Sequence, residues 1–273
     1  MKLQGQRVVL TGANGGIGHF LASQLAGKEA RLLLVDRNAE GLQQLCKEIA
    51  GAGGEACALP IDLLQPGAVE TVVATAGQQL GGIDLLINNA GLIDFTLFQQ
   101  HEPARIAQIM QLNSVLPMLL ARAALPQMLA RQSGRIVNVG SMFGSIGFPH
   151  HVVYSASKFA LRGFSQALRR ELADSGVGVT YVSPRAVKTA LNDARAQRMM
   201  QATGTAMDPP GYVAGKIIDA IEGERSECYI GMPESLFARL NGIFPALIDQ
   251  GLKEQTRVAH EFADRGIPNK IHN

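Results

Sequence analysis

The sequence has few cysteines and no long apolar run. Only three of its 273 residues are cysteines, at positions 46, 57 and 228, and their spacing does not match that of metal ligands. An odd, scattered set argues against a disulfide framework and favours a reducing compartment. No stretch approaches the ~20 apolar residues of a membrane-spanning helix, and the N-terminal "MKLQGQRVVLTG" contains no apolar segment long enough for a signal peptide. We therefore expect a cytoplasmic protein without a bound metal.

The sequence also lacks a large excess of positive or negative charge. The formal net charge is +2 and charged residues make up 18% of the chain, so the charge balance gives no indication of a nucleic-acid partner. Hydrophobic residues at 47% are typical of an ordinary globular protein. The length is within the range of a single α/β domain.

Short apolar runs alternate with longer amphipathic stretches along the chain. Strands are expected at 7–11, 31–36, 56–62, 84–88, 135–141, 177–183 and 227–231, and helices at 16–27, 39–51, 66–80, 103–131, 154–174 and 211–222. The strands are apolar on both faces, which is typical of buried parallel strands. The pattern predicts an α/β fold, a Rossmann-like doubly wound sheet of about seven parallel strands. Residues 1–231 would form one domain, and residues 232–273 a C-terminal helical extension.

A glycine-rich turn follows the first expected strand. In "TGANGGIGHF", Gly12, Gly16 and Gly18 come directly after a strand and open a helix. Such a turn brings backbone N–H groups against a phosphate at the positive end of the helix. Asp36 ends the next strand, where a carboxylate accepts hydrogen bonds from ribose hydroxyls. The alternative for the glycines alone is a flexible turn between strand and helix.

Tyr154 and Lys158 lie one helical turn apart in "YSASK". A tyrosine of pKa ~10 is a poor base at neutral pH, and a nearby ammonium favours the phenolate and lowers the pKa of the phenol. We therefore predict that Tyr154 is a general acid/base assisted by Lys158. An ordinary pair on an amphipathic helix is the alternative.

Taken as a set, these motifs resemble the short-chain dehydrogenase/reductase family. The matching pieces are "TGANGGIG", Asp62, "NNAG" at 88–91, Asn113, Ser141 and "YSASK", in the same order from about residue 5 to residue 231. The resemblance implies a nicotinamide cofactor and a catalytic set of Asn113, Ser141, Tyr154 and Lys158. The expected cofactor contacts are Gly12, Asn14, Gly16, Ile17, Gly18, Asp36, Arg37, Asp62, Asn89, Gly91, Tyr154, Lys158, Pro184, Val187 and Thr189.

Several of these residues have simpler alternative roles. Ser141 and Asp62 could satisfy a turn or cap a helix. Asn113 is followed four residues later by Pro117, which has no N–H to donate to the carbonyl of residue 113. We expect that free carbonyl to take part in a proton relay with the lysine, as the resemblance implies; a plain packing kink is the alternative.

The choice of cofactor depends on two adjacent residues. Asp36 repels a 2′-phosphate and favours NAD(H), whereas Arg37 could pair with that phosphate. The glycine loop carries Asn14 and Gly15 where phosphate-binding relatives often have a basic residue. The sequence therefore favours NAD(H) over NADP(H).

One segment departs from the family pattern. In "SPRAVKT", Arg185 stands where glycine is common. It is expected either to face the pocket and bind an acidic group of the substrate or a cofactor phosphate, or to be a solvated surface residue. Residues 190–210 look loop-like and are expected to form a lid over the substrate. In the tail, an apolar helical stripe interrupted by Pro245 is expected to pack over the pocket or on a sister subunit. A membrane-surface helix is the weaker alternative, because basic flanks are missing.

The function expected from these residues is interconversion of a secondary alcohol and a ketone on a mostly apolar small molecule, with NAD(P) as cofactor. The enzyme is expected to be a homodimer or homotetramer. The alternative is a nucleotide-binding sensor or scaffold that has the fold without turnover, because fold alone does not imply function.

Overall fold

The apolar runs pair into one parallel sheet. The computed structural model describes residues 1–264 and has its seven strands in the order β3-β2-β1-β4-β5-β6-β7, with every neighbouring pair parallel. The strands are β1 (Arg7–Thr11), β2 (Arg31–Asp36), β3 (Glu55–Pro60), β4 (Leu85–Asn88), β5 (Gly134–Val139), β6 (Val177–Pro184) and β7 (Glu227–Ile230). The order runs outward from β1 and β4 in both directions. The expected doubly wound, Rossmann-like fold is therefore confirmed, and its switch point lies between these two strands.

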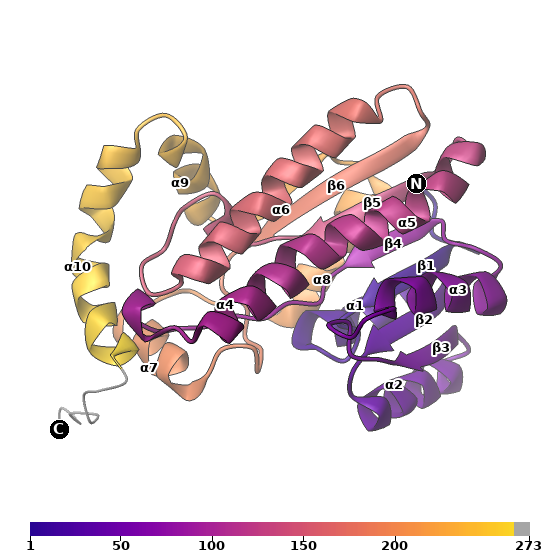
Figure 1. Cartoon of the computed structure of the whole chain (residues 1–273), viewed down its shortest axis with the longest axis horizontal. Coiled ribbons are helices and arrows are strands. Elements are labelled where there is room, and N and C mark those ends of the chain that lie inside the picture. The colour runs from indigo at the N-terminus through magenta and orange to yellow at the C-terminus, as the bar shows by residue number, and fades with distance from the viewer. Residues whose placement is uncertain (265–273) are drawn as a thin grey trace.

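Helices cover both faces of the sheet (Figure 1). They are α1 (Gly16–Ala26), α2 (Ala39–Gly51), α3 (Ala68–Leu80), α4 (Pro103–Met110), α5 (Leu116–Ala130), α6 (Val152–Glu171), α7 (Ala194–Ala202), α8 (Pro210–Glu222), α9 (Glu234–Asn241) and α10 (Pro245–Ala263), with short turns η1 (Phe98–Gln100), η2 (Gln111–Val115) and η3 (Met142–Gly144). One apolar core joins α1, α2 and α8 to the sheet, and a second joins α3, α5 and α6.

Alternate strand residues supply these two cores. Val8 and Leu10 of β1 belong to the core under α1, whereas Val9 lies in the core under α5. All three side chains are fully buried. Successive residues of a strand point to opposite faces, so a strand covered on both sides must be apolar throughout.

The long helix expected at 103–131 is interrupted. Residues 103–110 and 116–130 are α-helical, but Gln111–Val115 form a π-turn, η2. Pro117 lies just after this turn and cannot donate a hydrogen bond to the carbonyl of residue 113. The chain accommodates the missing donor by widening one turn, and Asn113 lies in the widened turn.

The segment 190–210 is more ordered than its composition suggested. It contains α7, which Asp193 caps by accepting a hydrogen bond from the amide of Ala196 at 2.7 Å. Ala196, Met199 and Met200 are buried at helical spacing against α10. The sequence pattern missed this helix because its apolar face is short and depends on a partner far along the chain.

The tail forms two helices after β7. Pro245 is the first residue of α10, where a missing N–H costs nothing, so it separates α9 from α10. Figure 1 shows both helices, in yellow, at the end of the molecule away from α2 and α3. Within residues 1–264, none of the helices combines the length and apolar character needed to span a bilayer. The remainder of the expected extension, residues 265–273, lies outside the described residues.

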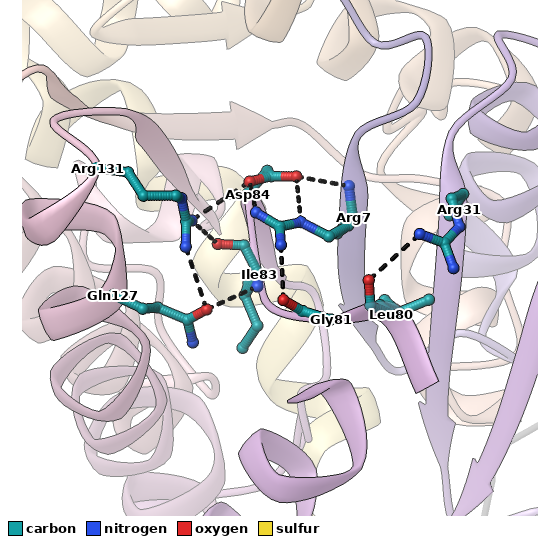
Figure 2. Close-up of polar contacts among 8 residues, drawn as sticks. All are labelled: Arg7, Arg31, Leu80, Gly81, Ile83, Asp84, Gln127 and Arg131. Atoms are coloured by element: carbon teal, nitrogen blue, oxygen red, sulfur yellow. Dashed lines mark hydrogen bonds and ion pairs between the residues drawn. The ribbon is translucent and has the colours of Figure 1, made fainter. Parts of the chain in front are cut away.

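A charged cluster joins β1, β4 and α5 at the amino-terminal edge of the sheet (Figure 2). Asp84 accepts hydrogen bonds from the backbone amide and Nε of Arg7 at 3.0 and 2.7 Å, and it pairs with Nη2 of Arg131 at 3.3 Å. Burial acts to raise the pKa of Asp84, but the hydrogen bonds and charge of Arg7, together with the charge of Arg131, lower it on balance. The ionised carboxylate therefore stabilises the fold.

Asp84→Asn is expected to lower the free energy of unfolding by about 2 kcal/mol at neutral pH, because charge-assisted hydrogen bonds to a partly buried group are lost. Urea titration measures the change. The matched control is Asp219→Asn, which removes an exposed pair with Lys216 and should cost less than about 0.5 kcal/mol. Equal losses in the two variants would contradict the assignment.

The parent protein and Asp84→Asn also allow a test of the pH dependence of stability. Because the folded-state pKa of Asp84 lies below its ordinary value of 3.8, its stabilisation is complete above that value and is lost as the pH falls through the folded-state pKa. The difference between the parent and Asp84→Asn should stay constant down to about pH 5 and shrink in more acidic solution.

Candidate active site

The turn between β1 and α1 has no room for side chains. Gly12 has φ of 64°, and a Cβ there would lie 2.8 Å from the Cα of Ala90. A Cβ on Gly18 would lie 2.0 Å from the carbonyl oxygen of Gly12. The two glycines let α1 begin directly against the carboxyl ends of β1 and β4. The first residues of α1, Gly16 and Ile17, therefore line the cavity, and the amino-terminal end of a helix is where a dinucleotide phosphate can bind.

Asp36 is held by backbone amides at the carboxyl end of β2. Its two carboxylate oxygens accept hydrogen bonds from the amides of Asn14 and Asn38 at 3.2 and 3.1 Å. These bonds fix the carboxylate at the cavity wall beside the exposed Arg37. The Asn14 side chain lies instead against α2, where a Cβ on Gly41 would meet it at 2.2 Å.

The end of β4 is tied to the glycine turn. Asn89 donates from Nδ2 to the carbonyl of Gly12 at 2.9 Å and from its amide to the Thr11 hydroxyl at 3.0 Å. Asp62 accepts from the amide of Leu64 at 2.9 Å, so its carboxylate also closes a local turn. These contacts hold Asn89, Gly91 and Asp62 in the cavity wall.

Ser141 lies two residues beyond the end of β5. Its Oγ accepts a hydrogen bond from the amide of Phe143 at 3.2 Å and caps η3. The side chain of Ser141 therefore satisfies a turn, which was the alternative role expected for it from the sequence. Its backbone carbonyl accepts from the hydroxyl of Tyr181 at 3.3 Å, a contact that places Ser141 at the cavity edge of the sheet.

Tyr154 and Lys158 are buried together on α6, in its first two turns. The Lys158 ammonium is 5.6 Å from the centre of the Tyr154 ring and donates a hydrogen bond to the carbonyl of Val139 at 2.9 Å. That bond holds the lysine against the end of β5. Ser141, Tyr154 and Lys158 thus line the same part of one cavity.

Burial dominates the titration of both groups. It raises the pKa of Tyr154 to about 12, while the hydrogen-bonding side chain of Ser141 acts to lower it. It also lowers the pKa of Lys158 to about 8. We expected the lysine to depress the pKa of the tyrosine, but the net shift is upward, because burial outweighs the hydrogen bond of Ser141. A neutral phenol is the protonation state needed to donate a proton.

Both polar atoms of the Asn113 side chain are hydrogen-bonded. Its Oδ1 accepts from the amide of Leu92 at 2.8 Å, and its Nδ2 donates to the Leu92 carbonyl at 2.8 Å and to Ser157 Oγ at 3.0 Å. Ser157 in turn donates to the carbonyl of Tyr154 at 2.7 Å. The asparagine therefore ties the loop after β4 to α6 from behind the cavity wall.

Arg185 is neither a free cation nor a solvated surface residue. Its guanidinium binds both carboxylate oxygens of Asp208, at 3.0 and 2.7 Å, and pairs with Glu234 of α9 at 3.4 Å. The expectation of a solvated surface arginine was therefore wrong. Binding of a substrate acid or a cofactor phosphate by Arg185 stays a prediction, which these ion pairs disfavour. The chain between residues 187 and 208 returns to its starting point through a parallel bridge of Val187 with Asp208, which brings the acid beside the arginine.

A cluster of aromatic rings lies beside Tyr154. Phe143 and Phe148 stack with centres 4.7 Å apart, and His151 lies 5.2 Å from Phe143. Burial lowers the pKa of His151 to about 4, although a bond to the carbonyl of Asp94 acts in the opposite sense. The imidazole is therefore neutral at physiological pH and packs as an aromatic ring.

The structure also shows supporting residues that sequence reasoning missed. Tyr181 lies in β6, and its ring occupies the space that a Cβ on Gly140 would take, at 2.3 Å. Within "VGVTYVS" it reads as an ordinary strand residue, so no local signal separates it from the core. Ser157 had a usable signal, because it lies three residues after Tyr154 on the same helix.

One large cavity contains most of the predicted residues. Its volume is about 1330 Å³, above the ~300–1,000 Å³ of a typical small-molecule site. The predicted residues in its wall are Gly12, Gly16, Ile17, Asp36, Arg37, Asp62, Asn89, Gly91, Ser141, Tyr154, Lys158, Pro184, Val187 and Thr189. Asn14, Gly18 and Asn113 are not in the wall.

The geometry fits a nicotinamide dinucleotide. The tight glycine turn leaves space for a phosphate, and Asp36 places in the same wall a carboxylate of the kind that accepts hydrogen bonds from ribose hydroxyls. Thr189 packs on Gly16, where a Cβ would meet its Cγ2 at 2.4 Å. Ser141 and Tyr154 lie further along the same cavity.

Comparison with known proteins agrees with this description. The family model described as short chain dehydrogenase matches residues 6–199. The ketoacyl reductase HetN of Nostoc sp. is 36% identical over 230 residues, covering 84% of this chain and 79% of that protein. The 3-oxoacyl-[acyl-carrier-protein] reductase FabG of Vibrio cholerae is 31% identical over 241 residues, covering 87% and 94%.

Two solved structures share the fold. A metagenomic short-chain oxidoreductase in complex with NADP has a TM-score of 0.71 at 30% identity, covering 84% of this chain and 98% of that one. A short chain dehydrogenase/reductase from Burkholderia phymatum in complex with NAD has a TM-score of 0.83 at 23% identity, covering 90% and 96%.

The chain belongs to the short-chain dehydrogenase/reductase family. It is accordingly an NAD(P)-dependent oxidoreductase acting on alcohol and keto groups.

Proposed function

We propose that the protein interconverts a secondary alcohol and a ketone on a mostly apolar small molecule, with Tyr154 as general acid/base. The observation that carries this proposal is the shared cavity, in which Ser141, Tyr154 and Lys158 lie beyond the glycine turn. The bound nicotinamide would exchange a hydride with the substrate carbon. The ketoacyl reductase relatives support the keto group as the reacting centre.

Each residue of the set has a distinct part. In reduction, the hydroxyl of Tyr154 gives its proton to the substrate oxygen, and in oxidation it takes the proton back. Ser141 donates to the same oxygen and holds it toward the phenol. Lys158 supplies positive charge that favours the phenolate as the proton leaves.

We propose that Asn113 contributes through its backbone, because both polar atoms of its side chain already hold structural hydrogen bonds. The π-turn before Pro117 leaves its carbonyl without a proline N–H donor, and a water bound there would link it to Lys158. Pro117→Ala is expected to alter the pH profile and the solvent isotope effect of turnover. Unchanged values for both would contradict the relay.

The function is tested by a panel of ketones and alcohols, with reduced or oxidised cofactor and absorbance at the nicotinamide band as the readout. Turnover of at least one apolar ketone is expected. Tight cofactor binding without turnover across the whole panel would favour the alternative, a nucleotide-binding sensor with the same fold.

We propose NAD(H) as the preferred cofactor. The support is Asp36, whose carboxylate is fixed at the cavity wall by two amides and would repel a 2′-phosphate. Arg37 lies in the same wall and could pair with a 2′-phosphate once the acid is gone.

Asp36→Asn keeps one of the two acceptor oxygens and removes the charge, so it is expected to raise kcat/KM for NADPH relative to NADH by at least about tenfold. Adding Arg37→Gln should cancel most of that gain, while Arg37→Gln alone should leave the NADH value within about twofold. A parent enzyme that strongly prefers NADPH would overturn the assignment.

We further propose a cytoplasmic homodimer or homotetramer. Exposed Leu119 and Leu129 on α5 and Phe159 on α6 offer apolar contact area, and the thiols of Cys46, Cys57 and Cys228 are free. Light scattering on the purified protein measures the assembly, and a monomer at micromolar concentration would contradict it.

A further inference from the structure

Beyond Ser141 and Tyr154, the wall of the cavity is formed by α7, α9 and α10, and we call this part of the cavity the chamber. This distal half is lined by Met199 and Met200 of α7, Phe237 and Leu240 of α9, and Ile248 and Leu252 of α10. All six side chains are apolar. Two are methionines, whose flexible thioethers adapt to the shape of a ligand.

Residues 190–210, which include α7, and the C-terminal helices α9 and α10 form one wall around this chamber. Arg195 of α7 donates to the carbonyls of Phe262 and Ala263 at the end of α10, at 2.8 and 2.6 Å. At the other end, Arg185 joins Asp208 at the base of the lid to Glu234 of α9. The chamber is therefore bounded by a fixed structure, although Phe237 remains 42% exposed at its edge.

The charges near the chamber are neutralised by partners. Among residues 1–264, Arg185 is the one cation that lines the cavity next to the chamber, and it is paired with Asp208 and Glu234. Glu234 is paired with Arg185, and Glu254 with Arg257. An anionic group entering the chamber would thus lose its hydration without gaining a counter-charge.

We propose that the distal half binds an extended, uncharged aliphatic chain of the substrate, while the reacting oxygen lies at Ser141 and Tyr154. This inference rests on the proposed function and names its substrate class: ketones and secondary alcohols that carry a long apolar chain. The chain gains by leaving water for these six apolar side chains. Thr203, Thr205 and Gln255 also line this part of the cavity, and their polar groups are hydrogen-bonded to one another.

A chain-length series measures this directly. For straight-chain methyl ketones from butanone to dodecanone, kcat/KM should rise by up to about fourfold for each added methylene until the chamber is filled. A ketone of the longest length that ends in a carboxylate should be at least about a hundredfold poorer. A flat series, or a carboxylate accepted as well as the uncharged chain, would overturn the proposal.

Gly251 offers a variant that should plug the chamber without disturbing the fold. It lies in α10 and lines the cavity, and a Cβ there would have no atom within 4 Å. The matched control is Gly77 of α3, an exposed helical glycine with the same free space that does not line the cavity. Leu252→Gln is a second variant that places a polar group in the wall at nearly constant size.

In Gly251→Phe, the ratio of kcat/KM for dodecanone to that for butanone should fall at least about tenfold, and in Leu252→Gln it should fall in the same direction. In Gly77→Phe the ratio should equal that of the parent. Equal ratios in all four proteins would show that the chain does not lie in the chamber.

Binding separates this inference from the proposed function. If no ketone is turned over, the rise in melting temperature caused by dodecanol still reports on the chamber. A rise in the parent and in Gly77→Phe that is lost in Gly251→Phe would support the chain site alone. Turnover of butanone with no chain-length dependence would preserve the proposed function and overturn the chain site.

Discussion

Tyr154→Phe is expected to lower kcat by about 10²- to 10⁴-fold, because the substrate oxygen loses its proton donor while its hydride source is unaffected. The phenol is buried among aromatic rings, with Phe143 6.1 Å away edge to face, so phenylalanine fills the same space. The change should therefore leave the melting temperature and cofactor affinity close to those of the parent. Steady-state turnover and cofactor titration measure the two effects separately.

Tyr212→Phe is the matched control for this experiment. Tyr212 lies on α8, is 50% exposed, and has the Lys216 ammonium over its ring at 5.7 Å. It thus repeats the pairing of a tyrosine with a lysine four residues later on a helix, but away from the cavity. Turnover should be unchanged. A Tyr154→Phe enzyme as fast as the parent would show that this phenol does not transfer the proton.

Gly18→Ala is expected to be the most damaging small substitution in the cofactor turn. Its Cβ would lie 2.0 Å from the carbonyl oxygen and 2.9 Å from the carbonyl carbon of Gly12, and backbone atoms cannot move aside as a flexible side chain can. Overpacking of this kind costs about 3 kcal/mol, which corresponds to a fall in melting temperature on the order of 10 °C. Cofactor affinity should fall more than tenfold (~1.4 kcal/mol), because α1 must withdraw from β1.

Gly77→Ala provides the comparison for Gly18→Ala. This position is also inside a helix, but a Cβ there would meet nothing within 4 Å. Alanine should raise stability by about 0.5–1 kcal/mol through its better helix propensity, with cofactor affinity unchanged. Thermal denaturation and cofactor titration of both variants are the measurements. If Gly18→Ala bound cofactor as tightly as the parent, the tight-turn argument would fail.

The order of strands and helices was predictable because each element carries its own signal. Two-sided apolar runs such as that of β1 can be stable only inside a covered sheet. Gly12, Tyr154 and Lys158 were also readable from the sequence, since each is local: a turn that needs glycine, and two side chains one helical turn apart. The catalytic and cofactor roles assigned to these residues remain predictions.

The features that escaped prediction depend on residues far apart in the chain. Arg185 looked like an isolated cation because its partners, Asp208 and Glu234, follow 23 and 49 residues later. The upward shift of the pKa of Tyr154 comes from its burial, which local spacing does not reveal. Helix α7 likewise depends on packing against α10.

The parallel bridge between Val187 and Asp208 has a consequence for how such enzymes diverge. The segment between these residues leaves and rejoins the fold at neighbouring points. The amide of Lys188 donates to the carbonyl of Asp208 at 3.0 Å, and the amide of Asp208 donates to the carbonyl of Ala186 at 2.9 Å. Residues can therefore be inserted or removed inside this loop without shifting β6 or the proton-transfer residues. Selectivity for a new molecule can then evolve through changes in this segment and in α10, which packs on it, while β6 and the residues at the carboxyl ends of the strands keep their positions.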